Sequence, residues 1–482
     1  MCLRRSDCVA APRAPALVCL AESRDGISWV KPSLGLYNFS GSTDNNILIG
    51  AEGCSVFMDP VRPGVTAAEQ YKMVCSNGEG ARGQLWSSPD GVHWHPLPSK
   101  ALTFSDDTQP TAFWDASLRK YVVYVRRNIG AHDAGHRRHL GRCITTNISD
   151  WQADATQQTC DGAGPEPCGC EVVFGADEHD PPTLDVYTNA HLPYPSAESP
   201  AIHLFFPSMF SHFSGTDAHT GPPNARSNDG LLDTRLLLAH DLRDNLSYAA
   251  DNSRAPFVSL GVNRCGAWTP DVMGGWCNPK DSSLSHTSVD TSSTWMAKGM
   301  IPSKDGDVIH LFHAGSPFTH AGVADPHHGW KNNSAIGILT LRRDGFVALE
   351  APYDFVNPAS FLTKPVVVPN DCPSVPGNAS SGARLLINVV TSAAGHIAVG
   401  VEPADNKPPP KAGPFDVQHS NRIKGNAIAA VASWAWAPTQ GRMASLEAWH
   451  GRSVRLRVEM VDARLFSLRM ACGSDETASA TL

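Results

Sequence analysis

The chain has 482 residues, of which 41% are hydrophobic and 18% charged, with 40 Gly and 37 Pro. This length predicts two or three domains, and the abundance of Gly and Pro favours an all-β protein of many short strands over long helices. The net charge of -8 leaves no basic stripe for a phosphate backbone, so nucleic acid is not an expected partner.

Segments that would direct the chain to a membrane are not found. No stretch reaches the roughly 18 consecutive apolar residues of a membrane-spanning helix, so no membrane span is expected. The short apolar run near the start is broken by Pro12, Arg13 and Pro15, and we expect no signal peptide.

The cysteines indicate an oxidising compartment. Several of the 13 cysteines crowd into Gly- and Pro-containing loops, at Cys160, Cys168, Cys170, Cys265 and Cys277. Such loop clusters favour disulfides, although a reduced protein of this size can also carry free thiols. N-glycosylation acceptor patterns occur at Asn38, Asn147, Asn245, Asn332 and Asn378. The expected location is therefore extracellular or in the secretory pathway.

A seven-residue pattern, Ser-x-Asp-Gly-x-x-Trp, occurs at residues 23–29 and again at 88–94. Asp-Gly is a strong turn signal. We expect Asp25 and Asp90 to shape the turn between two outer strands of a repeating unit. Trp29 and Trp94 are then expected to pack between units. The pattern is predicted to be scaffold rather than chemistry.

The segments around this pattern form a repeat. Residues 54–76 read as a strand, an Asp-Pro turn and a second strand, and residues 111–127 read as a strand, an Asp turn and a strand. The second of these is followed by Ser149, Asp150 and Trp151, which resemble the end of the pattern. A period of about 35 residues predicts one four-stranded antiparallel meander per unit.

The number of units predicts the fold. Residues 187–249 and 294–349 supply two further units, and the partial unit that ends in Trp29 makes five. Five such units predict a five-bladed β-propeller over residues 1–355, in which the first strand of each blade lines a central channel. The inner strand of the first blade would begin before Met1, so we expect that blade to be incomplete, truncated at its start.

The remainder of the chain has a different pattern. Strands that alternate apolar and polar residues, such as residues 454–460, predict a C-terminal β-sandwich over residues 356–475. Residues 476–482 are predicted to be a disordered tail.

At these residues the chain resembles the five-bladed β-propeller glycoside hydrolases, and specifically proteins labelled as containing a glycoside hydrolase family 32 N-terminal domain. The resembling stretches are "AESRDGISWVKPSLGL", "GSTDNNI", "VFMDP", "AAEQYKM", "SPDGVHW", "DTQPTAFWDASLRKYVVYVRR", "NDGLLD", "LRRDGFVAL" and "LTKPV". They cover nearly the whole chain. The resemblance implies a hydrolase of O-glycosyl bonds with a carbohydrate substrate and no cofactor.

The chain departs from the invertase-type members of that superfamily. Their Asn-Asp-Pro nucleophile, Arg-Asp-Pro stabiliser and Glu-Cys acid motifs do not occur here, so a fructan substrate is not carried over. In the family plan the nucleophile lies on the inner strand of the first blade, the strand that this chain is expected to lack.

Glycoside hydrolysis requires one carboxyl group as acid and another as base or nucleophile. In a propeller they belong where inner strands begin. Asp107 and Asp185 precede or open such strands in the same register. Glu178, beside Asp180, and Asp229 complete the candidate catalytic set, and we expect clustering to raise one pKa into the range of a general acid. For each of them an ordinary loop or turn role is the alternative.

Other side chains are candidates for substrate binding. Amide, aromatic and imidazole groups can contact sugar hydroxyls and ring faces, and Arg pairs with anionic sugars such as uronates or sulfate esters. The candidates are Gln109, Arg126, Arg127, Tyr187, His212 and His320. Core packing or surface positions are the alternatives for these residues.

Two further groups of residues are not assigned to a catalytic or metal site. Asp59, in Met-Asp-Pro, and Asp115 follow their strands and are predicted to be turn residues. His132, His136 and His139 have a spacing that could gather a metal ion on a helix, but the segment contains Gly and neighbours two Arg residues, so no metal site is predicted.

Three functions therefore stay open from the sequence. The leading one is a glycoside hydrolase that uses paired carboxylates at the propeller channel. The second is a catalytically inactive propeller that binds glycans, which the missing inner strand favours. The third is a propeller that serves as a platform for protein partners, which would require an exposed apolar patch.

Overall fold

The structure of the protein is a computed structural model. It describes residues 16–60, 62, 64–76, 84–98, 109–129, 137–149, 170–194, 202–214, 226–249, 254–261, 290, 292–316, 319–320, 334–370, 372, 382–405, 407–410, 414–435, 442–443, 445–472 and 479–481.

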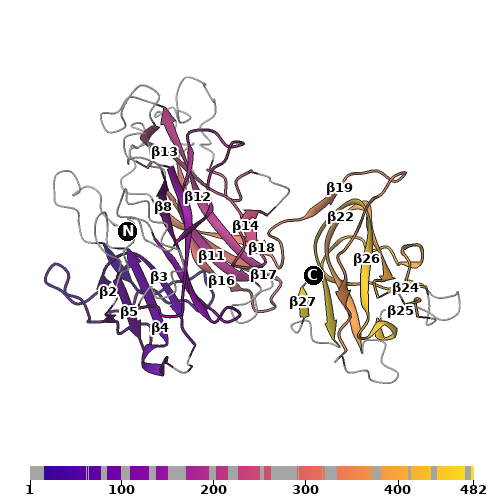
Figure 1. Ribbon diagram of the computed structural model, residues 1–482, viewed down its shortest axis with the longest axis horizontal. Helices are drawn as coiled ribbons and strands as arrows, with labels where there is room; N and C mark the ends of the chain where they lie inside the picture. The colour runs from indigo at the N-terminus through magenta and orange to yellow at the C-terminus, as the bar shows by residue number, and fades with distance from the viewer. Residues whose placement is uncertain are drawn as a thin grey trace. The chain divides into compact units, whose positions relative to one another are not determined.

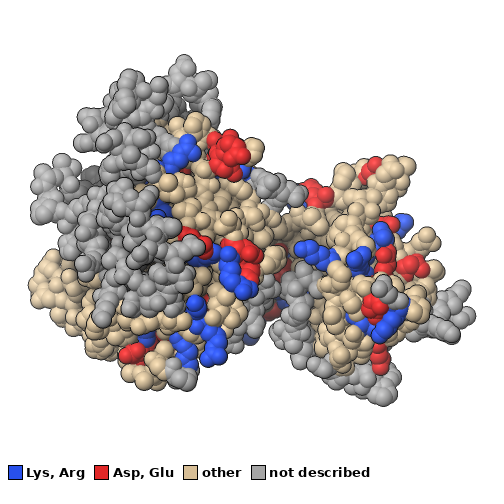
Figure 2. Space-filling model, viewed as in Figure 1, with Lys and Arg blue, Asp and Glu red and all other residues tan. Residues whose placement is uncertain are grey.

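The described residues form β-strands and short 3-10 turns, which confirms the all-β prediction. The chain divides into two compact units, one of residues Met1–Ile301 and His310–Leu339 and the other of residues Pro302–Ile309 and Thr340–Leu482. Within the described residues no helix is both long and apolar enough to cross a membrane. On the face drawn in Figure 2, basic and acidic side chains are interspersed in small groups.

Two sheets of the first unit are antiparallel meanders of four strands, as the repeat predicts. The first has the order β3-β4-β5-β6 and the second the order β10-β9-β8-β7; several of these strands are labelled in Figure 1. Their bounds are β3 Glu52–Met58, β4 Tyr71–Ser76, β5 Gln84–Ser88, β6 His95–Leu97, β7 Thr111–Asp115, β8 Lys120–Ile129, β9 Arg137–Thr145 and β10 Glu171–Phe174.

A larger sheet contains the predicted fourth and fifth units. Strand β12 (Ile202–Ser214) pairs with β11 (Leu184–Tyr194) on one side, and with both β14 (Leu237–Ala239) and β13 (Arg226–Thr234) on the other. The remaining strands are β15 Ser247–Tyr248, β16 Ser293–Pro302, β17 Val308–Ser316 and β18 Ala335–Arg342. A single parallel bridge, Leu232 to Ser293, joins β13 to β16.

The fifth unit differs from the prediction at its end. The sequence pattern placed residues as far as Leu349 in this unit. Instead, β19 (Leu349–Ala351) pairs with β26 of the second unit, Leu349 opposite Leu465. The partial first unit contains β1 (Leu17–Cys19) paired with β2 (Ile47–Gly50). Alternation alone does not choose a strand's partner, because pairing depends on which sheet edge the chain reaches.

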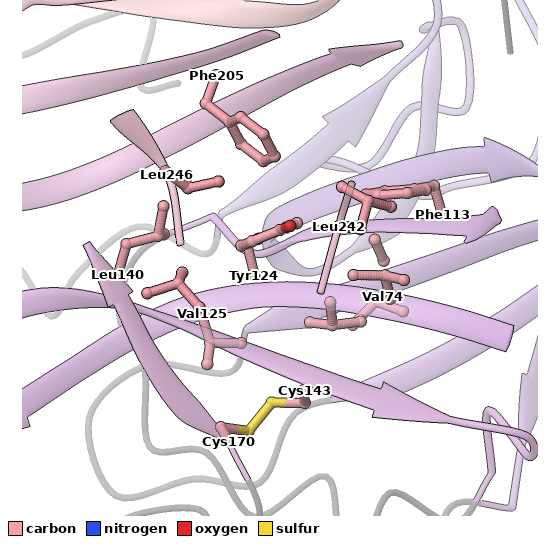
Figure 3. Close-up of a cluster of buried hydrophobic side chains, with 14 of the residues drawn as sticks. Val74, Phe113, Tyr124, Val125, Leu140, Cys143, Cys170, Phe205, Leu242 and Leu246 are labelled. Carbon is pink, nitrogen blue, oxygen red and sulfur yellow. A yellow bond between two sulfur atoms is a disulfide. The ribbon is translucent and has the colours of Figure 1, made fainter. Parts of the chain in front are cut away.

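The main core of the first unit lies between the β7–β10 sheet and β12. Tyr124 and Val125 of β8 and Leu140 of β9 pack with Phe205 of β12 and with Leu242 and Leu246 (Figure 3). All six side chains are buried. Since Tyr124 and Val125 are consecutive in β8 and both are buried, this strand buries side chains on both of its faces.

The second unit is built on two long strands. Strand β22 (Ala383–Pro403) pairs along its length with β26 (Ser453–Cys472), with an interruption between Thr391 and His396. Strands β19, β20 (Ala359–Leu362), β21 (Val366–Val367) and β27 (Ser479–Thr481) also pair with β26, and β23 (Asn426–Val431) with β22. Strands β24 (Trp434–Ala435) and β25 (Arg442–Met443) form a hairpin. The core contains the fully buried Trp434 and Trp449.

Both copies of Ser-x-Asp-Gly-x-x-Trp form the same turn. Oδ1 of Asp90 accepts hydrogen bonds from the backbone N–H of Val92 and His93, both at 2.8 Å, and Trp94 Nε1 donates to Gly91 O at 3.0 Å. Residues 23–29 repeat this set of bonds. Gly91 has φ 78° and Gly26 has φ 73°, a left-handed conformation that favours glycine. The predicted scaffold role is confirmed.

The tryptophans of this turn pack as predicted. Trp29 meets Phe312 of β17 edge-on, with ring centroids 5.7 Å apart. Trp94 packs against a small cluster that includes Ile49 of β2 and Met73 of β4. Each ring therefore connects strands of different sheets.

Three disulfides are present among the described residues. They join Cys54 to Cys75 across β3 and β4, Cys143 to Cys170 across β9 and β10, and Cys372 to Cys472 in the second unit. Cys19 is free and exposed. Cys160, Cys168, Cys265 and Cys277 lie outside the described residues. The prediction of disulfides is confirmed.

Candidate functional site

Asp185 is the second residue of β11, where the chain enters the sheet. The segment before it turns through two prolines, and Leu184 N–H donates to Pro181 O at 2.9 Å. A proline cannot donate to a strand ladder, so the strand begins only after Pro182. In the register of β11 and β12, Asp185 stands opposite Phe210.

The carboxylate of Asp185 is enclosed by the side chains of a histidine and an arginine. His212 of β12 donates from Nε2 to Oδ2 over 3.1 Å, and Arg138 of β9 places Nη1 3.7 Å from the same oxygen. The backbone N–H of Arg138 also donates to Oδ2, at 3.3 Å. The Asp185 side chain is only 1% exposed. Three strands, β9, β11 and β12, therefore meet at one carboxylate.

These contacts determine the protonation state of Asp185. Burial raises the pKa of this carboxyl group, but the hydrogen bond from His212 and the charges of Arg138 and His212 outweigh it, so the pKa lies below its ordinary value. Asp185 is consequently ionised at neutral pH. The expectation that clustering would raise the pKa of a carboxyl group here is wrong for Asp185, because its close neighbours are His212 and Arg138 rather than other carboxylates.

Aromatic and imidazole rings surround Phe210 beside this carboxylate. The ring centroid of Phe210 lies 3.8 Å from that of His212 and 4.6 Å from that of His320. Tyr187 meets His320 edge-on at 5.0 Å and Phe210 at 5.8 Å. The guanidinium carbon of Arg138 lies 5.3 Å from the Phe210 centroid. We call Asp185, His212, Arg138, Tyr187 and His320 the Asp185 cluster.

A β-bulge places Tyr187 in this cluster. The pairing of β11 with β12 shifts between Val186 and Thr188, so Tyr187 is the extra residue on its strand. Bulges re-aim a side chain in this way and are frequent next to functional sites. The structure thus brings together four residues that the sequence had nominated separately, Asp185, Tyr187, His212 and His320.

Asp229 lies at the same end of the sheet. Its Oδ1 accepts a hydrogen bond from Gly230 N–H at 2.8 Å, and Gly230 stands opposite His212 and accepts a hydrogen bond from His320 N–H at 3.0 Å. Asn-Asp-Gly resembles a turn signal in the sequence, but these residues belong to β13. A Cβ on Gly230 would lie 2.1 Å from Ser211 O, so glycine permits the close strand approach.

The acidic loop before β11 does not act as one carboxylate group. Glu178 is exposed, and its carboxylate lies 3.8 Å from His179. Asp180 is buried and pairs with Arg235 and Arg254. Each acidic side chain therefore has its own surroundings, and only Asp185 enters the cluster. Asp107 lies outside the residues that the structure describes.

The other nominated residues lie at a neighbouring pocket. Arg126, Gln109 and Tyr187 are among its lining residues. Gln109 donates to Cys54 O at 2.7 Å. Arg127, on the opposite side of β8 from Arg126, donates to Cys170 O at 2.9 Å.

Two members of this region escaped the sequence analysis. Arg138 appeared only as a neighbour of a rejected histidine cluster, and Phe210 as part of an apolar strand. Arg138 and Asp185 are 47 residues apart, and their contact depends on how β9 packs against β11. No local pattern signals that contact. The described residues contain no group of three or more His, Cys, Asp or Glu side chains arranged to hold a metal ion.

Of the two Asp residues set aside as turn residues, Asp59 follows β3 as predicted, whereas Asp115 is the last residue of β7. Asp115 Oδ1 accepts from Leu118 N–H at 2.7 Å. Asp59 is fully buried. Its carboxylate pairs with Arg62 and lies 3.6 Å from Lys72 Nζ. It also accepts a hydrogen bond from the Tyr121 hydroxyl at 2.8 Å. Asp59 thus anchors the turn after β3 to strand β8.

Comparison with known proteins gives structural likenesses only. No protein-family model matches the chain, and no curated protein matches it. Several solved structures that are similar to it are described as glycoside hydrolases. One described as a glycoside hydrolase is 13% identical, with a TM-score of 0.37, over 66% of this chain and 76% of the other. A fructofuranosidase from Schwanniomyces occidentalis complexed with fructosylnystose is 9% identical, with a TM-score of 0.34, over 93% and 87%. A thermostable family-43 glycoside hydrolase is 10% identical, with a TM-score of 0.29, over 61% and 69%.

Proposed function

We propose that this protein is a glycoside hydrolase that cleaves a glycosidic bond in a poly- or oligosaccharide at the Asp185 cluster. The observation that carries the proposal is Asp185, a carboxylate held ionised by His212 and Arg138 at the start of β11. A fixed negative charge stabilises the positive charge that develops on the sugar in an oxocarbenium-like transition state.

The acid, base and sugar-binding roles are assigned to residues that are closer to solvent than Asp185. Asp229 is half-buried at the same strand end and is the best candidate among the described residues for the acid or base that contacts the substrate. Glu178 is a weaker candidate because it is exposed and outside the cluster. Asp107 remains a prediction from the sequence. Tyr187 and His320 offer half-buried rings against which a sugar face can pack.

The proposed scaffold is a five-bladed β-propeller followed by a β-sandwich, resembling glycoside hydrolase family 32 proteins. The meanders β3–β6 and β7–β10, the group β11, β12, β14 and β15, and the group β16–β18 would be four blades, with β1 and β2 in the fifth. Asp185 then opens an inner strand, the place where a channel-facing site belongs. In the second unit, the interruption between Thr391 and His396 would let the long strands fold over into two layers.

The proposed location is outside the cell or in the secretory pathway. Three disulfides among the described residues support it, because disulfides persist in oxidising compartments.

A second candidate function is glycan binding without hydrolysis. The specific observation in its favour is the burial of Asp185, whose Oδ2 is already shared by His212 and Arg138. A carboxylate that is already bound by these two side chains can instead hold the His212 ring and the Arg138 guanidinium in place in a binding site. In that case Asp229 would act as a hydrogen-bonding group rather than as an acid.

A hydrolysis screen separates the two functions. The purified chain would be incubated with a panel of plant, algal and animal oligosaccharides, with detection of new reducing ends and of binding by calorimetry. Hydrolysis that is lost in Asp185→Asn and Asp229→Asn, but kept in the matched exposed variant Glu178→Gln, supports the hydrolase. Binding of a glycan that is never cleaved supports the second function. A chain that neither binds nor cleaves any glycan contradicts both.

A further inference from the structure

Three of the Asn-x-Ser/Thr patterns of the sequence begin within the described residues, at Asn38, Asn147 and Asn245. Such a pattern is the acceptor for an N-linked glycan. An attached sugar chain is bulky and hydrated, so in a folded protein the Asn side chain must reach solvent. The three patterns differ in how the residue between the Asn and the Ser packs, and this difference identifies two of them as surface sites.

Asn147 lies in a turn just after the end of β9. The middle residue of its pattern, Ile148, is 5% exposed and belongs to the main core of the first unit. Because Ile148 is held in the core, Asn147 is left exposed and Ser149 partly exposed. Ser149 N–H donates to Asn147 Oδ1 at 3.0 Å, and Asn147 N–H donates to the Thr145 hydroxyl at 3.1 Å. The turn therefore holds the side-chain oxygen of Asn147, and not the nitrogen to which a glycan is attached.

Asn245 has the same arrangement in the loop before β15. Its middle residue, Leu246, labelled in Figure 3, is 7% exposed and packs in the same core. Asn245 and Ser247 on either side of it are exposed. Arg142 of β9 donates from Nη1 to Asp244 O at 2.8 Å, which attaches this loop to the sheet. Both patterns are thus presented at the surface by an apolar residue anchored in the core.

The pattern at Asn38 is packed differently. Its middle residue, Phe39, is 47% exposed and anchors nothing in the core. Asn332 and Asn378 lie outside the residues that the structure describes. The inference is therefore restricted to Asn147 and Asn245.

Both surface patterns are far from the Asp185 cluster. Arg138, which contacts Asp185, lies near the start of β9, and β9 continues for seven residues before the turn of Asn147. At the usual rise of a strand these residues span about 23 Å. Strand β15 pairs through β14 with Leu204 of β12, six residues or about 20 Å from Phe210, which stands opposite Asp185. A glycan on either Asn leaves the Asp185 cluster open.

We propose that Asn147 and Asn245 are modification sites that carry N-linked glycans. The inference goes beyond the proposed hydrolase and rests on the proposed location in the secretory pathway. The glycan donor is an oligosaccharide linked through a diphosphate to a lipid. The side-chain nitrogen of the Asn forms a bond to C1 of the first sugar and loses one proton, while the bond from C1 to the diphosphate oxygen breaks and the lipid diphosphate leaves.

Glycan occupancy tests the two sites directly. The full chain is produced behind a secretion signal in a eukaryotic host, and peptides from cells and medium together are analysed by mass spectrometry before and after treatment with a peptide-N-glycosidase. Asn147→Gln and Asn245→Gln should each remove one glycan. Ser149→Ala and Ser247→Ala keep the Asn but remove the hydroxyl of the pattern, and they should remove the same glycans. Threonine at either serine position should keep them.

The matched control is Asn357→Gln, which removes an exposed Asn that belongs to no acceptor pattern. It should leave both glycans in place. Enzymatic removal of the glycans from the folded chain should not change binding or cleavage at the Asp185 cluster.

The disulfide state separates failure of the sites from failure of the location. If both Asn are unmodified while Cys143 and Cys170 are joined, the sites are refuted and the secretory location stands. If both Asn are unmodified and these cysteines are reduced, the proposed location has failed as well. Occupancy of one Asn alone refutes the proposal for the other, and a glycan that persists in the Ser→Ala variant contradicts modification through this pattern.

Discussion

Oδ2 of Asp185 lies 3.1 Å from Nε2 of His212, and the two side chains are buried together between strands β11 and β12. Neither residue is near the other in the chain. Their contact, with Arg138 as a third member, produces an ionised carboxylate at a strand end.

Replacing Asp185 by Asn should remove activity and lower stability. The variant leaves the Arg138 charge without its carboxylate, and breaking a buried pair in this way costs about 3 kcal/mol or more. Loss of the fixed charge should reduce kcat by at least about 100-fold. Urea denaturation and initial rates on the best substrate of the screen measure the two effects. A variant that is destabilised but keeps full kcat per folded molecule would show that Asp185 has only a structural role.

The same pair predicts an acid limit to stability. The pKa of Asp185 is lower in the folded chain than the ordinary 3.8. Its contribution to stability is therefore complete above pH 3.8 and is lost as the pH falls below that value. In Asp185→Asn this part of the acid dependence should disappear. If the stability of Asp185→Asn changes between pH 5 and pH 3 as much as that of the unchanged protein, the ion pair of Asp185 with Arg138 and His212 is contradicted.

A buried histidine pair predicts a second pH dependence of stability, at a less acidic pH. Nε2 of His191 lies 3.0 Å from Nδ1 of His203, and the His191 ring stacks on Phe113 at 4.0 Å. Burial lowers the pKa of both histidines below 6.5. The charge of Asp115 raises the pKa of His203, but burial has the larger effect. The folded chain thus binds fewer protons than the unfolded chain, and stability should decrease as the pH falls below 6.5.

Urea midpoints at pH 7.5 and pH 5.5 measure this loss, which approaches about 1.4 kcal/mol per pH unit for each proton excluded. The variant His191→Phe keeps an aromatic ring against Phe113 and removes one titrating group. Its stability at pH 7.5 can differ in either direction, but its pH dependence should be smaller. Equal dependence in both proteins would show that His191 is not the group that titrates.

The disulfides should differ in how much each contributes to the free energy of unfolding. Cys372–Cys472 closes a loop of 100 residues, whereas Cys54–Cys75 closes one of 21. The chain-entropy relation predicts losses of about 5 and about 3 kcal/mol respectively when each pair is changed to Ser. Calorimetry should therefore show the larger shift for the first pair, in the transition of the second unit. A larger shift for the Cys54–Cys75 variant would contradict the entropic account.

The Ser-x-Asp-Gly-x-x-Trp turn predicts a stability effect without a functional one. Asp90→Ala removes the acceptor for Val92 and His93 N–H and should lower Tm. Asp90→Asn keeps a side-chain oxygen and should lower Tm less. Glycan binding should be unchanged in both variants. Loss of binding at an unchanged Tm would mean that this turn takes part in the site.

The sequence by itself determined the features that depend on neighbours in the chain. Short apolar runs form the strands β7 and β8, and Asp90 closes its turn through bonds to residues two and three positions ahead. Local hydrogen bonds and side-chain alternation act within a few residues, so they can be read from a short segment. The nomination of Asp185 came from this strand register.

Only the tertiary structure decided how those residues meet and with what electrostatic result. Arg138 reaches Asp185 from another sheet, a bulge re-aims Tyr187, and Asp180, two residues from Glu178, is neutralised by Arg235 and Arg254. The sequence shows acidic residues in one loop, but a pKa depends on the charges within a few ångströms. Those charges come from strands far apart in the chain, and their distances follow from packing rather than from spacing.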